Sequence, residues 1–451
     1  MPHHDLLIIG AGSGNSIIGP EHDDLDVAIA ERGAFGGTCL NVGCIPSKMF
    51  VYAAEVAALA EHVGPSLGVH TSLNGADWPA IRDRVFGRID PIAQGGADYR
   101  RSLDHVTVYD TSVSFVDAKT VRAGDAQVTA DQIVIAAGAR PVVPDIAGLS
   151  DVGFHTSDTI MRVDELPKRL AVLGGGYIAT ELGNVFGSFG SEVTFIVRGG
   201  SLLRNEDHDV SAVFTAAYAE RFDVRLNTQV ESVRREGDDI VLTLDSGRPE
   251  LRVDAILVAT GRVPNSDQLG LRDAGYEISA AGYLQVDEHG RSNVDGVFGL
   301  GDITNPVQLK HVANHEARVV RHNLSNPTDL RSFNHRHIPH AVFGHPQVAS
   351  VGLTQAQAET ANLDVVCHVQ SYGSAAYGWA MEDDTSIVKL VMDRASRLLL
   401  GAHICGPQAS TLIQQLVQGM TFDQSVDDMA RGQYYAHPAL PEVIEQALLE
   451  L

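Results

Sequence analysis

The chain has 451 residues, which is long enough for about three domains with sizeable cores. Its formal net charge is −24, with 33 Lys and Arg against 57 Asp and Glu. Nucleic acids and anionic membranes require a basic footprint, so we expect neither as a partner.

The N-terminus leads directly into an apolar strand, without a basic segment before a long apolar run. No apolar segment reaches the ~20 residues needed to span a bilayer. We therefore expect a cytoplasmic protein with no membrane partner.

A dinucleotide-binding βαβ pattern opens the chain. We expect a strand at 6–9, a glycine turn, a helix, and a second strand at 27–30 that ends at Glu31. The glycines of the turn are Gly10, Gly12 and Gly14. They allow pyrophosphate to approach backbone N–H groups at a helix N-terminus, while Glu31 can accept a hydrogen bond from a ribose hydroxyl. Asn15 stands where the third glycine is usual, and Gly14 can compensate for it.

Two of the four cysteines, Cys39 and Cys44, are separated by only four residues. In an intracellular chain with few cysteines, such a pair is more often redox-active than structural. A zinc site would need two more ligands at matching intervals, and none lies nearby. Pro46 fits the first turn of a helix that begins just after Cys44, and a helix N-terminus lowers a thiol pKa. We predict a pair that switches between dithiol and disulfide.

A second glycine turn follows a strand at 169–173 and precedes a strand at 192–197. Its first residues include Gly174, Gly176 and Tyr177. The second strand ends at Arg198, with Arg204 six residues later, and guanidinium groups suit a 2′-phosphate. This favours NADPH over NADH. The alternative is that both arginines are ordinary surface charges.

Two similar segments, 133–141 and 256–264, each form an apolar strand that ends at a glycine turn, so they are candidate domain boundaries. A short buried strand at 297–302 delivers Asp302 at its C-terminal end, where ligands bind in open α/β sheets. A plain turn aspartate is the alternative. Beyond residue 332, strands such as 386–392 and apolar helices from Ala409 onward indicate an α+β domain.

In their order along the chain, the glycine turns, the cysteine pair, an Ala-Thr-Gly-Arg segment, Gly-Asp and a terminal His-Pro resemble the flavin-dependent pyridine nucleotide-disulfide oxidoreductases. Glutathione reductase and dihydrolipoamide dehydrogenase typify that family, and the resemblance covers essentially the whole chain. It implies an α/β fold with two Rossmann-like domains and a C-terminal α+β dimerisation domain. It also implies FAD, NADPH, a small-molecule disulfide substrate, and a homodimer whose C-terminal domains complete the active sites. The expected segments are 1–149 for FAD, 150–264 for NADPH, 265–332 completing the FAD domain, and 333–451 for dimerisation.

By this resemblance, Cys44 would lie against the flavin as a thiolate, and Cys39 would attack the substrate disulfide. Lys48 would lie near the flavin and pair with Glu181. His437 and Glu442 resemble the acid–base dyad of the family, in which the carboxylate fixes the histidine tautomer. The expected cofactor-binding residues are Gly10, Gly12, Gly14, Glu31, Gly37, Thr38, Gly138, Asp302, Gly174, Gly176, Tyr177, Arg198, Arg204, Gly261 and Arg262. For Lys48 and Tyr177, which resembles a lid over the flavin, a surface position is the alternative.

Four further histidines alternate along an expected strand without an adjacent carboxylate or cysteine. They are His335, His337, His340 and His345. We interpret them as solvated or interface residues and expect no metal site.

Residues 13–16, 48–54 and 377–383 resemble the branch of the family that reduces mycothiol disulfide. No cysteine follows Cys405, which argues against large thioredoxin reductases and mercuric reductases, and lipoamide dehydrogenases normally carry an acid where Arg198 stands. We expect NADPH-dependent reduction of mycothiol disulfide through FAD and the cysteine pair. Reduction of glutathione or lipoamide disulfides stays open. So does an NADPH-flavin electron carrier to quinones or oxygen, with the cysteines as a structural bridge.

Overall fold

The computed structural model describes residues 1–451, except for the side chain of Ser246. The chain forms two compact units. The first unit comprises Met1–Ser47, Arg82–Val142 and Gly261–His335, and the second comprises Lys48–Ile81, Val143–Thr260 and Arg336–Leu451. The expected division into four segments stays a prediction.

A mixed sheet in the order β3-β2-β1-β6-β5-β4, with β16 also paired to β6, forms the centre of the first unit. Its strands are β1 (His3–Ile9), β2 (Val27–Ala30), β3 (Val106–Tyr109), β4 (Val113–Asp117), β5 (Thr120–Ala123), β6 (Ala126–Ile135) and β16 (Val297–Gly299). The strands β1, β2, β3, β6 and β16 run parallel. In β1, Leu6 and Ile8 belong to one hydrophobic core and Leu7 and Ile9 to another. The sheet is therefore buried on both faces, which explains its continuous apolar runs.

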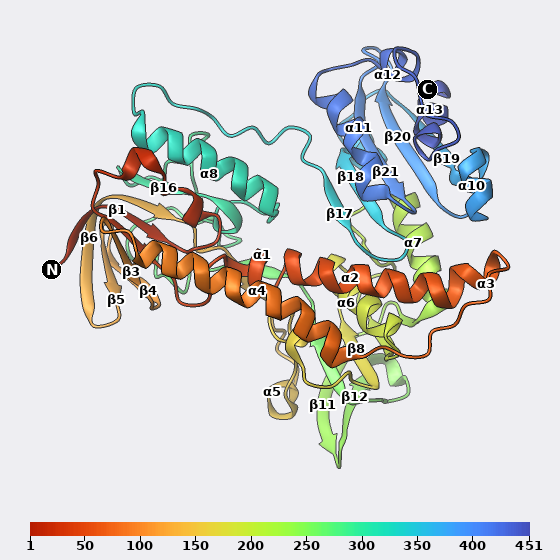
Figure 1. Ribbon diagram of the computed structural model, residues 1–451, viewed down its shortest axis with the longest axis horizontal. Coiled ribbons are helices and arrows are strands. Elements are labelled where there is room, and N and C mark those ends of the chain that lie inside the picture. Colours follow the sequence, from red (N-terminus) through yellow and green to blue (C-terminus); the bar gives the residue numbers. More distant parts are fainter. The chain divides into compact units, whose positions relative to one another are not determined.

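In the described stretch between β1 and β2, no α-helix forms, and the predicted helix after the first glycine turn is wrong. The stretch contains only the 3-10 turns η1 (Gly14–Ser16) and η2 (Pro20–His22). Gly19 and Pro20 interrupt the apolar residues too soon for a helix to propagate. Helix α8 (Lys310–Ser325) packs into the core on the sheet face that carries Leu6 and Ile8 (Figure 1).

The two similar segments noticed in the sequence meet at their C-terminal ends. Strands β7 (Ala139–Pro141) and β15 (Arg262–Pro264) pair antiparallel, with Val263 opposite Arg140. The chain passes from one unit to the other directly after Val142 and directly before Gly261.

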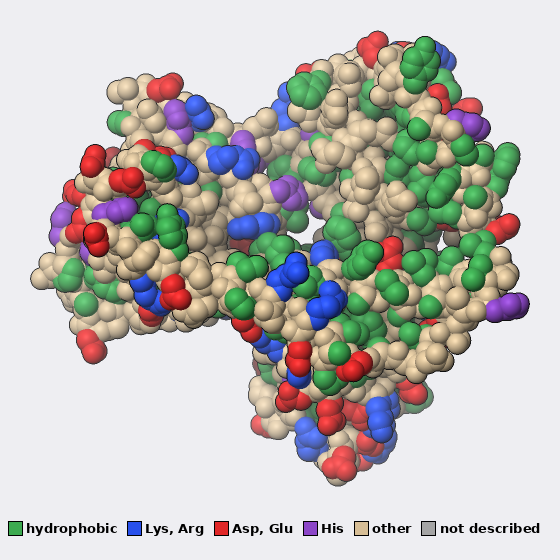
Figure 2. Space-filling view, in the orientation of Figure 1, with side chains coloured by type: hydrophobic (Ala, Val, Ile, Leu, Met, Phe, Trp, Pro, Cys, Tyr) green, Lys and Arg blue, Asp and Glu red, His purple; other side chains and the backbone are tan. Residues whose placement is uncertain are grey.

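The second unit contains a parallel sheet in the order β10-β9-β8-β14. Its strands and helices are β8 (Arg169–Leu173), α6 (Tyr177–Ser188), β9 (Glu192–Ile196), α7 (His208–Arg221), β10 (Asp223–Arg225) and β14 (Ala255–Val258). The helix expected after the second glycine turn is thus present as α6. An antiparallel sheet of β11 (Val230–Glu236), β12 (Asp239–Leu244) and β13 (Leu251–Val253) adjoins it in sequence. Acidic and basic side chains interleave on this sheet (Figure 2), where Arg234 pairs with Glu236 and Glu250.

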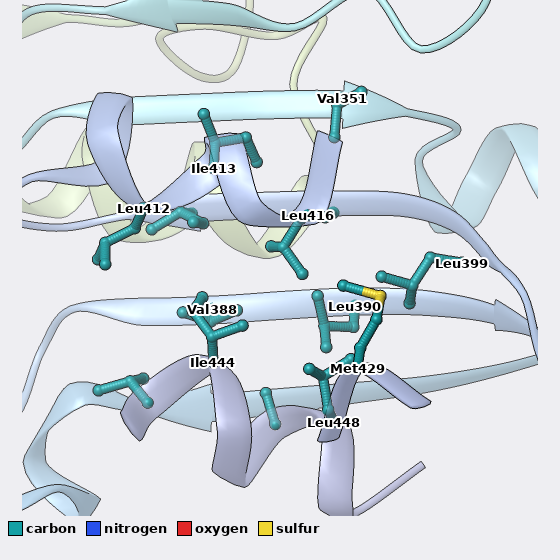
Figure 3. Close-up of a cluster of buried hydrophobic side chains, with 14 of the residues drawn as sticks. Val351, Val388, Leu390, Leu399, Leu412, Ile413, Leu416, Met429, Ile444 and Leu448 are labelled. Carbon is teal, nitrogen blue, oxygen red and sulfur yellow. The ribbon is translucent and has the colours of Figure 1, made fainter. Parts of the chain in front are cut away.

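The C-terminal part of the second unit is an antiparallel sheet in the order β17-β18-β21-β20-β19 with helices, as expected. Its strands are β17 (His340–Val342), β18 (Val348–Gly352), β19 (Val365–Ser371), β20 (Ile387–Asp393) and β21 (Leu399–Cys405). Its helices are α9 (Gln355–Thr360), α10 (Ala376–Met381), α11 (Ala409–Thr421), α12 (Val426–Arg431) and α13 (Pro441–Leu449). Leu416 of α11, Leu390 of β20 and Ile444 of α13 share one buried cluster (Figure 3).

Helices α1 (Gly37–Asn41), α2 (Cys44–Ala58) and α3 (Gly64–Ser66), with the π-helical turn η3 (Leu59–Val63), form most of one helical run. The run Gly37–Ser66 has 30 residues, a mean hydropathy of 1.3 and 33% burial, so by length and composition it could cross a membrane. This differs from the expectation of no such segment. It is weak evidence, because core helices pass the same test, and the run is broken at Val42 and Gly43. The remaining helices are α4 (Trp78–Arg101), α5 (Leu149–Val152), η4 (Ile160–Arg162), η5 (Asp245–Gly247), η6 (Gly301–Ile303) and η7 (Tyr372–Ser374).

Candidate active site

The first glycine turn has the close backbone packing that a dinucleotide site requires. Gly10 adopts φ +104°, and a Cβ there would lie 2.4 Å from the carbonyl oxygen of Ala136. A Cβ on Gly14 would lie 2.9 Å from Ala136 Cβ and 3.1 Å from Ile8 Cγ2. The close approach that the fingerprint assigns to its third glycine therefore occurs at Gly14, although the helix is absent.

Glu31 lies directly after β2 and is tied to this turn. One carboxylate oxygen accepts a hydrogen bond from the Ala11 N–H at 2.8 Å, and the other accepts one from the Gly33 N–H at 2.9 Å. An ionised carboxylate has about four acceptor positions, so Glu31 can still receive a ribose hydroxyl.

The cysteine pair is attached to the same turn. The Gly36 N–H donates to the Ala11 carbonyl at 3.0 Å, and a Cβ on Gly37 would lie 2.7 Å from Gly12 Cα. Helix α1, which carries Thr38 and Cys39, therefore begins where the glycine turn passes.

The side chains of Cys39 and Cys44 lie in hydrogen-bond contact. Cys44 is exposed and is the first residue of α2, as the Pro46 signal indicated. The hydrogen bond with Cys44, burial, and the charge of Cys44 raise the pKa of Cys39. This proximity allows a disulfide to form and break without a large rearrangement of the chain.

Asp302 lies in η6, directly after β16, and burial raises its pKa while the charges of Arg262 and Lys310 oppose the rise. Arg262 also donates to the Ala139 carbonyl at 2.7 Å. Gly138 and Gly261, which directly precede Ala139 and Arg262, adopt φ +65° and φ +134°.

Two charged residues of α8 were not singled out in the sequence. Glu316 accepts hydrogen bonds from the Gly301 N–H and the Asn305 amide, both at 2.6 Å, and so holds the turn that carries Asp302. Lys310 donates to the Ser13 hydroxyl in the first glycine turn at 2.8 Å. No sequence motif marks either residue. Lys310 contacts a residue about 300 positions away in the sequence, and Glu316 contacts one 15 positions away.

The second glycine turn has the same close packing and a helix. Gly174 adopts φ +131°, and its Cβ would lie 2.3 Å from the Ala259 carbonyl oxygen. Helix α6 begins at Tyr177, directly after Gly176, and the Tyr177 side chain is 45% exposed. An N-terminal helix end beside a glycine turn suits a dinucleotide phosphate.

Arg198 and Arg204 are exposed and belong to the loop after β9. The side chain of Arg204 lies close to the residue that follows Arg198, because a Cβ on Gly199 would be 3.9 Å from Arg204 Cδ. The loop thus presents two guanidinium groups at the strand end where a ribose phosphate would bind.

Lys48 and Glu181 form the expected ion pair. Glu181 is buried, and its other carboxylate oxygen accepts the Phe343 N–H at 2.9 Å. The Lys48 ammonium also lies 4.7 Å from the centre of the Phe343 ring. Lys48 is therefore held in one position, which a positioning role requires.

His437 and Glu442 also pair as expected. His437 Nδ1 lies 2.7 Å from one carboxylate oxygen of Glu442. The other oxygen of Glu442 accepts a hydrogen bond from the Ala439 N–H at 3.1 Å. The hydrogen bond with His437, and then that from Ala439, lower the pKa of Glu442. With Nδ1 bound to a carboxylate, Nε2 of this 72% exposed histidine is left to exchange protons.

The expected histidine strand is wrong. Only His340 lies in a strand, β17, while His335, His337 and His345 lie in loops. Carboxylates distant in sequence do meet two of them, because His335 lies 2.9 Å from Glu316 and His340 lies 2.7 Å from Glu206. Among the described residues, no group of three or more His, Cys, Asp or Glu side chains could hold a metal ion.

The family model for pyridine nucleotide-disulphide oxidoreductases matches residues 4–317. The chain belongs to this family. The model of the family's dimerisation domain matches residues 338–448. These matches confirm the fold class, the class of enzyme and the two cofactors predicted from the sequence: the protein is an NADPH-dependent disulfide oxidoreductase that uses FAD and NADPH. The dimerisation domain supports a homodimer, and the family supports a small-molecule disulfide substrate.

Several proteins resemble the chain over its full length. A mycothione reductase of Mycobacterium tuberculosis is 48% identical, with 100% of both chains covered. A glutathione reductase of Burkholderia cepacia is 33% identical, with 91% of both covered. The solved structure of an HOCl-induced flavoprotein disulfide reductase, RclA, from Escherichia coli has a TM-score of 0.87 at 25% identity, with 99% of both chains covered.

Proposed function

We propose that the enzyme reduces mycothiol disulfide with NADPH. The observation that carries the proposal is the 48% identity to mycothione reductase over both complete chains, against 33% to a glutathione reductase and 31% to a dihydrolipoyl dehydrogenase. Arg198, in the loop after β9, agrees with a 2′-phosphate on the nicotinamide cofactor.

The described residues fit both cofactors, because each glycine turn has a position that only glycine can occupy. FAD would be held by the first turn, Glu31, Thr38 and Asp302, and NADPH by the second turn with the two arginines of its loop. When bound, FAD supplies a two-electron carrier between NADPH and the cysteine pair.

The cysteines then carry out thiol–disulfide exchange. The Cys39 thiolate attacks one sulfur of the substrate and forms a mixed disulfide, and the other half of the substrate leaves as a thiolate. The Cys44 thiolate next attacks the Cys39 sulfur, which reforms the protein disulfide and releases the second half. His437 protonates the leaving thiolates through Nε2, with Glu442 fixing the proton on Nδ1.

In the proposed homodimer, each subunit supplies its His437–Glu442 dyad to the other's active site.

The net charge of −24 offers no basic footprint for nucleic acid or an anionic membrane. With only four cysteines in 451 residues, the chain has no disulfide framework of the kind found in secreted proteins, which supports a cytoplasmic location.

Steady-state rates with mycothiol, glutathione and lipoamide disulfides at fixed NADPH test the substrate. We expect kcat/KM to be highest for mycothiol disulfide, by about a hundredfold if the pocket hydrogen-bonds its sugar. Equal or higher values with another disulfide would contradict the proposal.

Cys44→Ala should abolish turnover of every disulfide, whereas an NADPH-flavin carrier to quinones or oxygen would keep its quinone activity and require no cysteine.

A further inference from the structure

The two glycine turns of the chain lead into different local structures. After the second turn, α6 provides twelve helical residues that begin at Tyr177. After the first turn there is only the 3-10 turn Gly14–Ser16. A helix N-terminus normally contributes a partial positive charge and N–H donors to a dinucleotide pyrophosphate, so the first site lacks this contribution.

Three cationic side chains contact the stretch that replaces the helix. Arg100, which is 8% exposed, donates to the side chain and carbonyl oxygen of Asn15 at 2.8 and 2.7 Å. Arg321 of α8 forms a bidentate ion pair with Glu21. These two cations already have protein acceptors, and they hold the stretch in its non-helical shape.

Lys310 is different. Its ammonium donates to the neutral hydroxyl of Ser13 at 2.8 Å, and none of the ion pairs within the described residues includes it. The Ser13 hydroxyl in turn donates to the Asn314 side chain at 3.1 Å. Lys310 and Asn314 both belong to α8, so this helix holds the Ser13 hydroxyl on its donor and its acceptor side. The charge of Lys310 opposes the rise in pKa of both Cys39 and Asp302, which places it among the turn, the cysteine pair and η6. This half-buried ammonium donates to a neutral hydroxyl, and the nearby Asp302 interacts with its charge without forming an ion pair with it among the described residues.

We propose that Lys310 binds the pyrophosphate of FAD and replaces the missing helix at the first glycine turn. An ammonium donates charge-assisted hydrogen bonds to phosphate oxygens, and Ser13 aligns it at the turn. The inference rests on the proposal that the first turn holds FAD.

The test measures the FAD dissociation constant of the full-length protein by equilibrium dialysis with flavin fluorescence. Lys310→Gln should weaken FAD binding about tenfold or more and should reduce the dependence of affinity on salt, while Lys310→Arg should retain most of the affinity. The matched control is Arg318→Gln, which removes a positive charge from an exposed position of the same helix and should leave the affinity unchanged.

Thermal unfolding of the FAD-free variants separates binding from a purely structural role. We expect the Tm of FAD-free Lys310→Gln to stay near that of the FAD-free wild type. A lowered Tm with unchanged FAD affinity would overturn the proposal, and so would equal losses of affinity in Lys310→Gln and Arg318→Gln. Failure of the wild type itself to bind FAD would instead refute the proposed function.

Discussion

The two cysteines of the predicted redox pair are in direct contact. Their hydrogen bond, the burial of Cys39 and the charge of Cys44 all raise the pKa of Cys39. In the proposed cycle, the attacking thiol therefore needs a base, and His437 with its Nδ1 bound to Glu442 is suited to that task.

We predict that Cys44→Ala lowers the pKa of Cys39. The variant removes the hydrogen bond and the neighbouring charge that raise this pKa, so the Cys39 thiolate should form at a pH lower by about one unit or more. The measurement is the rate of iodoacetamide alkylation at Cys39 against pH in the reduced protein, with the modified site identified by mass spectrometry.

Cys367→Ala is the control, because Cys367 lies in β19 and does not contribute to the pKa of Cys39. Its alkylation profile at Cys39 should match the wild type. An identical profile in Cys44→Ala would show that the two thiols are not coupled.

At the scale of elements, apolar runs and glycine turns predicted most strands of both nucleotide sheets. Strands β1, β2, β8 and β9 lie where the apolar runs and the glycine turns placed them. The glycine motif predicted a helix after the first turn, and this helix is absent. Gly19 and Pro20 were a local signal against it. The side chains that hold the non-helical stretch, Arg100 and Arg321, come from distant parts of the chain, so no spacing could reveal them.

We predict that Arg321→Gln destabilises the first unit in a pH-dependent way. The hydrogen bond from Arg321 lowers the pKa of Glu21 from its ordinary 4.5 to about 2. Because the folded-state pKa is the lower one, this stabilisation is present above pH 4.5 and is lost as pH falls toward 2. Both side chains are about a third exposed, so after discounting for solvent screening we expect about 1 kcal/mol, or roughly 2–4 °C in Tm.

The measurement is Tm by calorimetry from pH 7 down to the lowest pH at which the wild type stays folded. The difference between wild type and Arg321→Gln should narrow as the solution becomes more acidic. A double-mutant cycle with Glu21→Gln isolates the pair, because the second substitution should then cost little more than the first. Full additivity would show that the pair contributes nothing.

At the scale of the molecule, the residues predicted for the site are divided in sequence between the two compact units. The cysteine pair and the first glycine turn belong to the first unit, whereas the His437–Glu442 dyad belongs to the second. The resemblance predicted the pairing of Lys48 with Glu181, because motifs mark both residues. It could not show Glu316 or Lys310, whose contacts depend on how α8 packs.

The segment that carries the dyad predicts where the homodimer forms. Tyr434 is fully exposed in the single chain, only three residues before His437, and it lies within the matched dimerisation domain. We expect this tyrosine to be buried by the second subunit, because aromatic side chains dominate the energetics of interfaces. Tyr434→Glu should therefore raise the dimer dissociation constant by about thirtyfold or more, as measured by sedimentation velocity.

The same variant should also lose disulfide turnover at concentrations where it is monomeric, because the dyad would no longer reach the other subunit's cysteines. Val116→Glu is the matched control, since it places the same charge at an exposed apolar position outside the dimerisation domain. It should remain dimeric and active. If Tyr434→Glu were monomeric but fully active, each chain would complete its own active site, and the proposed sharing between subunits would be wrong.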